Sequence, residues 1–78
     1  MARQINEIAR EIKTLWPKPY FGAVPYLNAM QSLRDVTSAY GMDSGKGIVL
    51  YFLSNASTWR GQDAKRIKAE LKALCGVK

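Results

Sequence analysis

The chain contains 78 residues with a formal net charge of +6, and 47% of its residues are apolar and 23% charged. These values are typical of a folded globular protein and exclude an extensively disordered chain, while the short length predicts one domain over residues 1–78. No apolar run is long enough to cross a bilayer and no signal peptide is recognisable, so we expect a cytoplasmic protein. The amphipathic first helix could lie on a membrane surface, but Glu7 and Glu11 disfavour this alternative and we expect no membrane partner.

The residue types that support most enzyme mechanisms are scarce. The sequence has no histidine, which excludes an imidazole base, and its single cysteine, Cys75, cannot form an internal disulfide or a Cys/His metal site. Glu7 and Glu11 lie four residues apart, a spacing typical of the solvated face of a helix rather than of a catalytic carboxylate pair. We therefore predict a protein that is not an enzyme and needs no cofactor or metal.

The first segment with helical periodicity predicts a helix over residues 3–16. Its apolar residues recur at steps of three and four, and they are Ile5, Ile8, Ala9, Ile12, Leu15 and Trp16. Pro17 cannot continue a helix, so the helix should stop there.

A connection rich in proline and aromatic residues follows at positions 17–26. Its aromatic residues, Tyr20, Phe21 and Tyr26, have two interpretations. They form a docking surface, or they complete the core, and in so small a domain we favour the core.

A second helix is expected after this connection, from Pro25 to Tyr40. Proline suits the first turn of a helix, and apolar residues follow at three- or four-residue steps. Gly41 would end this helix as its C-terminal cap.

The most apolar stretch of the chain is Ile48–Leu53, six residues without a charge. A strand here would lack a partner, because the other extended stretch is interrupted by prolines that cannot donate to a ladder. We therefore predict a buried central helix that is capped by Asp43 or Ser44 and continues through Ala56. Gly45 and Gly47 fall in its first two turns, where each glycine costs about 1 kcal/mol relative to alanine. Either these glycines allow close packing against a neighbouring helix, or the helix begins only at Gly47.

The last part of the chain predicts a turn at Ser57–Gly61 and a helix over Gln62–Cys75, ended by Gly76. Apolar residues mark the inner face of this helix, and they are Ala64, Ile67, Leu71 and Leu74. The expected fold is all-α, a compact bundle of about four short helices with the aromatic, proline-rich loop between the first and the second.

Positive charge gathers at the end of the chain, where residues 60–78 hold six basic side chains against Asp63 and Glu70. Such an excess attracts acidic proteins or nucleic acids. The candidate contact residues lie in the turn at 58–61 and the last helix, and they are Trp59, Arg60, Lys65, Arg66, Lys68 and Lys72.

Two classes of partner fit these residues, and a third interpretation needs no partner. A protein would bind the basic helix and the turn before it, whereas a nucleic acid would make phosphate contacts and stack a base on Trp59. Residues 33–44 also match the pattern of the first helix and turn of a helix-turn-helix motif. The segment that follows is apolar, however, and leaves no polar face that could contact base edges. The third interpretation is a solvated basic face beside a tryptophan that belongs to the core, and we favour it over contact with a nucleic acid.

Two stretches, Tyr20–Leu27 and Ile48–Gly61, followed by the basic segment Lys65–Lys72, resemble small uncharacterised bacteriophage proteins, particularly those of actinobacterial phages. The resemblance covers nearly the whole chain and implies a compact domain in the cytoplasm of a bacterial host, but it brings no activity and no catalytic residues. We therefore expect a small basic phage protein that binds a host or phage protein. The alternative is a nucleic-acid-binding accessory or regulatory protein that uses the basic C-terminal helix.

Overall fold

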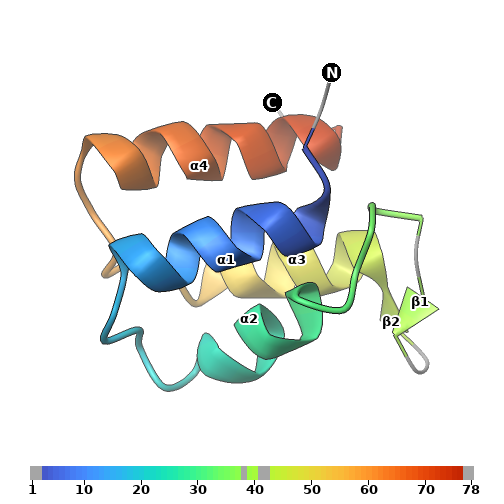
Figure 1. Ribbon diagram of the computed structural model, residues 1–78, viewed down its shortest axis with the longest axis horizontal. Coiled ribbons are helices and arrows are strands. Elements are labelled where there is room, and N and C mark those ends of the chain that lie inside the picture. Colours follow the sequence, from blue (N-terminus) through green and yellow to red (C-terminus); the bar gives the residue numbers. More distant parts are fainter. Residues whose placement is uncertain (1–2, 38, 41–42, 77–78) are drawn as a thin grey trace.

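Helices α1 (Ile5–Leu15), α2 (Val24–Met30), α3 (Gly45–Ser54) and α4 (Gln62–Leu74) form the structure, as Figure 1 shows. The computed structural model describes residues 3–37, 39–40 and 43–76. Two short strands, β1 (Ala39–Tyr40) and β2 (Asp43–Ser44), form an antiparallel ladder in which Ala39 is paired with Ser44 and Tyr40 with Asp43. The predicted all-α bundle, with the proline-rich loop between the first two helices, is confirmed.

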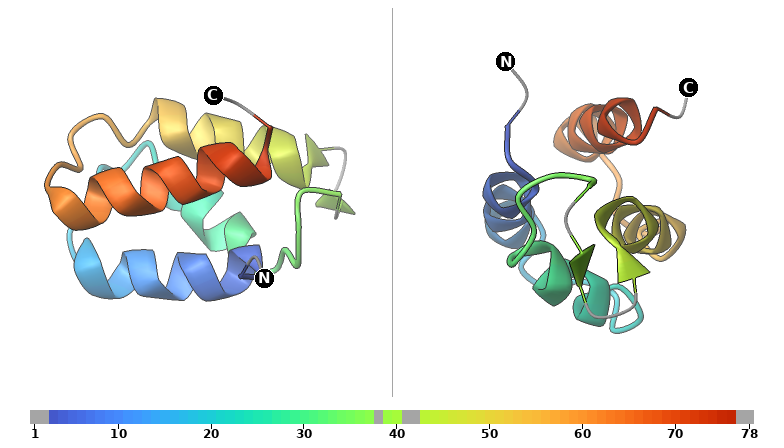
Figure 2. Two further views of the ribbon diagram at one scale, coloured as in Figure 1. Left: turned by 90° about the horizontal axis from the view of Figure 1, so that it is seen from above. Right: turned by 90° about the vertical axis from the view of Figure 1, so that its right-hand side faces the viewer.

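The four helices surround one core. The end view in Figure 2 shows α1 and α3 on opposite sides of the bundle, with α4 and α2 at the other two corners. Each helix packs against its two neighbours around this ring, so α4 contacts both α1 and α3. The two long sides of α4 therefore face different neighbours, and this difference is important for the candidate functional site.

Helix α3 forms over the apolar run, but it is one of four helices around the core rather than a central one, and it ends at Ser54 instead of Ala56. Its Tyr51 is 53% exposed. The helix begins at Gly45, and the hydroxyl Oγ of its N-cap Ser44 accepts a hydrogen bond from the backbone N–H of Gly47 at 3.1 Å. Phe52 is the largest fully buried side chain of the described residues, and Ile48 and Val49 are buried beside it. The helix interpretation of residues 48–53 is confirmed and the strand interpretation is excluded.

Helices α1 and α4 bury the residues that their periodicity predicts. The buried side chains are Ile5, Ile8, Ala9 and Ile12 on α1, and Ala64, Ile67 and Leu71 on α4. Helix α1 starts with a capping box in which the side chains of Gln4 and Glu7 bond each other's backbone N–H. Helix α4 is followed by Gly76, whose φ of +73° is the left-handed conformation that glycine adopts most easily.

The prediction of a long second helix is wrong, because α2 ends at Met30 instead of running to Tyr40. The carbonyl oxygens of Leu33 and Arg34 accept hydrogen bonds from the first N–H groups of α1, and that of Val36 accepts one from Lys46 in α3. These bonds satisfy helix N-termini that would otherwise lack partners, and a continued α2 would use the same carbonyls internally.

A local hydrogen bond also stops the second helix. The carboxylate of Asp35 accepts a hydrogen bond from the backbone N–H of Thr37 at 2.8 Å, which is a turn that competes with helix. The predicted cap, Gly41, lies outside the described residues. The helix-turn-helix pattern of residues 33–44 does not correspond to a helix at residues 33–37, which are not helical. Residues 38, 41 and 42 lie outside the described part.

The aromatic loop does not complete the core in the way we favoured. Phe21 is 79% exposed and Tyr20 is 44% exposed, whereas Tyr26 is half-buried against Tyr51 of α3. A turn explains this, because the N–H groups of Ala23 and Val24 bond back to the carbonyls of Tyr20 and Phe21 just before α2 begins. The core interpretation was therefore wrong for Tyr20 and Phe21, whose rings lie on the surface.

Candidate interaction surface on the last helix

Helix α4 carries opposite patterns of charge on its two sides. Asp63, Arg66 and Glu70 follow one another at steps of three and four, and so do Lys65, Lys68 and Lys72. Each set therefore forms its own stripe along the helix. The first stripe faces α1, as its ion pairs show, and the second lies on the α3 side, as the contacts of Lys68 show.

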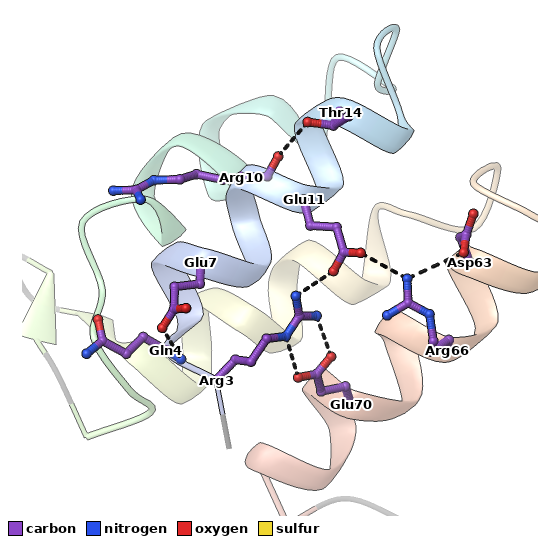
Figure 3. Close-up of polar contacts among 9 residues, drawn as sticks. All are labelled: Arg3, Gln4, Glu7, Arg10, Glu11, Thr14, Asp63, Arg66 and Glu70. Carbon is purple, nitrogen blue, oxygen red and sulfur yellow. Dashed lines mark hydrogen bonds and ion pairs between the residues drawn. The ribbon is translucent and has the colours of Figure 1, made fainter. Parts of the chain in front are cut away.

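The α1 side of α4 is an ion-pair network that we call the seam (Figure 3). Arg3, just before α1, donates from Nε and Nη2 to the two carboxylate oxygens of Glu70, at 3.0 and 2.6 Å, and its Nη1 lies 2.6 Å from Glu11. Arg66 of α4 bonds the other oxygen of Glu11 at 3.0 Å and Asp63 at 3.4 Å. Three carboxylates thus share two guanidinium groups, and the seam links the N-terminus of the chain to both α1 and α4.

The electrostatics of the seam agree with this pairing. Hydrogen bonds from Arg66 and then Arg3 lower the pKa of Glu11, and a hydrogen bond from Arg3 lowers that of Glu70. The same bonds raise the pKa values of Arg3 and Arg66, so all four groups are held in their charged forms. The carboxylates on this side of α4 are therefore paired with arginines of the same chain.

The α3 side of α4 carries what we call the basic strip, which consists of Arg60, Lys65, Lys68 and Lys72. Burial, followed by the positive charges of Lys72 and Arg60, lowers the pKa of Lys68, which places these three cations close together. Within the described part of the chain, no carboxylate lies within 4.0 Å of Arg60, Lys65 or Lys72. The strip is therefore a positive surface without internal compensation.

Lys68 differs from the other members of the strip because its charge supports the fold. Its Nζ donates hydrogen bonds to the carbonyl oxygens of Ala56 and Trp59, both at 2.6 Å, and lies 5.9 Å from the centre of the Trp59 ring. These bonds tie α4 to the turn between α3 and α4. Lys68 is thus a structural cation with its neighbours Arg60, Lys65 and Lys72 exposed around it.

A hollow of about 470 Å³ opens where the turn meets the start of α4. Trp59 and Ala64 provide its apolar floor, and Arg60, Lys65 and Lys68 provide basic groups around it. Ser57, Gly61 and Gln62 complete the lining. An apolar depression surrounded by cations is suited to a group that combines an apolar part with negative charge.

The six residues singled out from the sequence lie in four different settings. Trp59 is only 5% exposed and stacks on Trp16 with ring centres 5.5 Å apart, so it is the core tryptophan of the simpler interpretation and cannot stack a base. Arg66 belongs to the seam, and Lys68 holds the turn. Arg60, Lys65 and Lys72 remain exposed and close to the hollow or the strip.

The sequence prediction missed two contributions to this side of the molecule. Residues 44–62, which include all of α3, contain no aspartate or glutamate, so α3 offers no negative charge to the strip. Lys46 of α3 also adds its charge here, since it acts on the thiol of Cys75 at the end of α4. The long acid-free stretch is visible in the sequence and would have indicated this surface.

The described residues offer little for chemistry. Among them, no group of three or more cysteine, aspartate or glutamate side chains is placed to hold a metal ion. Burial raises the pKa of the Cys75 thiol, which lowers the fraction of reactive thiolate. Across residues 3–37, 39–40 and 43–76, no helix has the length and apolar character needed to span a membrane.

Comparisons of the chain with protein-family models, with curated proteins and with solved structures found no match. The charges and the hollow of α4 are therefore the basis on which a function can be argued.

Proposed function

We propose that this chain is a small, basic, non-enzymatic interaction module that binds another protein through the basic strip and the adjoining turn at 58–61. One observation carries the proposal, namely the sorting of charge on α4. The seam neutralises its acidic groups, whereas Arg60, Lys65 and Lys72 have no carboxylate partner among the described residues. Exposed cations that the fold does not use are available to a partner, and a complementary acidic surface would steer its approach.

The non-enzymatic part of the proposal is supported by the side chains themselves. The sequence lacks histidine, and Glu11 and Glu70 are held ionised by arginines, so neither is tuned to exchange a proton near neutral pH. Cys75, the single cysteine, is buried. These features favour binding over catalysis.

The resemblance to small phage proteins extends the proposal to a setting. We infer that the partner is a host or phage protein in the cytoplasm of an infected bacterium. This part rests on the stretches Tyr20–Leu27 and Ile48–Gly61, which carry the resemblance.

Charge reversal on the strip tests the proposal. The double variant Lys65→Glu, Lys72→Glu should lose proteins that the unchanged chain captures from a bacterial lysate by crosslinking. The matched control is Lys13→Glu, Lys18→Glu, which alters the net charge equally at exposed positions away from α4. Proteins identified by mass spectrometry should be retained by the control. Equal capture by both double variants would contradict a role for the strip.

The alternative function is a nucleic-acid-binding accessory or regulatory protein that uses the same helix. It is favoured by the uncompensated lysines and disfavoured by the burial of Trp59, which leaves the strip and the turn at 58–61 without an aromatic ring for stacking. A gel-shift series at rising salt tests it, because affinity from phosphate contacts falls steeply with salt. No shift at low salt would remove this alternative.

A further inference from the structure

The α3 helix adds an apolar stripe beside the basic strip. Lys46, Leu50 and Leu53 are spaced four and three residues apart, so they lie along one side of α3. The charge of Lys46 acts on Cys75, at the C-terminal end of α4, and Lys68 bonds the carbonyl of Ala56, just after α3. The stripe therefore runs next to α4, with the two helices antiparallel.

The α4 side of the molecule thus presents a surface with two apolar areas and positive groups beside them. Leu50 and Leu53 are half-buried on α3, and Trp59 and Ala64 line the hollow at the start of α4. Arg60, Lys65 and Lys68 lie around the hollow, while Lys46 lies near the other end of α4, where its charge acts on Cys75. Neither α3 nor the turn adds a carboxylate to this surface, since residues 44–62 contain none.

We propose that the segment bound by this surface is an acidic protein segment with a bulky apolar side chain between its carboxylates. The apolar side chain enters the hollow at the start of α4, and the carboxylates pair with Arg60 and Lys65 beside it. The inference rests on the proposed function and adds the chemistry of the partner. The hollow of about 470 Å³ lies within the size range of small-molecule sites and is large enough for one such side chain.

The details of the surface favour a protein segment over a nucleic acid. A phosphate backbone would use the cations but would leave the apolar floor at Ala64 and Trp59 without a counterpart. A base cannot use Trp59, whose ring is buried against Trp16. An apolar side chain flanked by carboxylates matches both the floor and the charges, and central apolar anchors carry much of the binding energy at protein interfaces.

Fluorescence anisotropy with designed peptides tests the inference. The probe is a labelled peptide of about twelve residues with glutamates on both sides of one central leucine. Two matched peptides replace either the leucine by serine or the glutamates by glutamines. Because burying a leucine contributes about 1.5–3 kcal/mol and each 1.4 kcal/mol is a factor of ten, the serine peptide should bind about tenfold more weakly or worse. The glutamine peptide should also bind about tenfold more weakly, since its charges are removed.

Protein variants locate the site. Lys65→Glu should weaken binding of the leucine peptide about tenfold, while Lys13→Glu, with the same change of net charge on α1, should alter it less than about twofold. Ser57→Phe places a ring at an exposed position in the lining of the hollow without changing any charge. It should weaken the leucine peptide and leave the serine peptide unchanged. Circular dichroism confirms that each variant is folded.

The outcomes separate this inference from the proposed function. Equal binding of the leucine and serine peptides would overturn the apolar anchor but leave a charge-driven protein contact standing. Absence of peptide binding would overturn the inference, and the lysate capture with the double variants would still decide the proposed function. Tighter binding of duplex DNA than of the leucine peptide, lost in Lys65→Glu, would overturn both.

Discussion

The two sides of α4 contain nearly the same number of charged residues and use them in opposite ways. On the α1 side, Asp63 and Glu70 meet arginines at 2.6–3.4 Å and form the seam. On the α3 side, Lys72 acts on Lys68, Lys65 shares the lining of the hollow with Arg60 and Lys68, and neither Lys65 nor Lys72 meets a carboxylate among the described residues. The comparison teaches that pairing, rather than the number of charges, separates a structural side of a helix from a side that is available for binding.

Replacing Lys68, the half-buried cation of the strip, should give the largest change in stability. Lys68→Met keeps most of the side-chain stem but removes both hydrogen bonds from Nζ, to the carbonyls of Ala56 and Trp59. The Ala56 carbonyl still accepts a bond from the N–H of Trp59, whereas the Trp59 carbonyl keeps no partner among the described residues. The free energy of unfolding should fall by about 2 kcal/mol, measured by urea denaturation. Lys72→Met is the control and should change it by less than about 0.5 kcal/mol. Equal effects would mean that Lys68 does not hold the turn.

A smaller loss is expected from the centre of the seam. Glu11→Gln removes the negative charge that Arg3 and Arg66 share, at distances of 2.6 and 3.0 Å. Because the network is partly exposed, the free energy of unfolding should fall by about 1 kcal/mol. Arg10→Gln, an exposed α1 position with no ion pair among the described residues, is the matched control and should have almost no effect. If both variants were equally stable, the seam would contribute nothing to folding.

The pH dependence of stability should come from the same side. The pKa values of Glu11 and Glu70 are lowered in the folded chain from an ordinary value of 4.5. The unfolded chain therefore binds more protons as the pH falls below this value, and the contribution of the seam is present above it and lost as the pH falls through the folded pKa values. Urea midpoints measured down an acid series should converge for the unchanged chain and Glu11→Gln. A constant difference between them would contradict this.

The smallest change in stability is expected on the exposed part of the strip. Lys65→Glu breaks no hydrogen bond or ion pair among the described residues, so its melting temperature should stay close to that of the unchanged chain. Peptide binding should nevertheless fall strongly in the same variant. A clear loss of stability would show that Lys65 belongs to the fold, and the distinction between the two sides of α4 would be lost.

Much of the fold follows from local patterns in the chain. Ile48–Leu53 is apolar enough to require a buried face, Ser44 is a suitable cap, and Gly76 suits a helix end, so α3 and α4 could be predicted closely. The end of the second helix could not be predicted in this way. It depends on the carbonyl oxygens of Leu33, Arg34 and Val36, which accept hydrogen bonds from N–H groups at the starts of α1 and α3. These bonds join residues far apart in sequence, and no local pattern reveals them.

The candidate site was predicted in part for the same reason. The run of basic residues after position 59 is visible in the sequence, but it does not show that Arg66 is taken by Glu11 or that Trp59 is stacked on Trp16. The exposure of Phe21 likewise depends on a turn against α2. Predicting any of these three features requires knowing which helices and loops are neighbours in the fold.

The sequence by itself determined the buried faces of α1 and α4, the positions of three helices and the excess of positive charge, because helical periodicity and charge are local properties. The tertiary structure alone decided which of those charges remain available. Folding places Arg3, at the beginning of the chain, against Glu70 near its end, and thereby uses the acidic groups on one side of α4. The lysines on the other side are left exposed beside an apolar hollow, because the neighbouring helix α3 and the turn after it contain no acid to meet them.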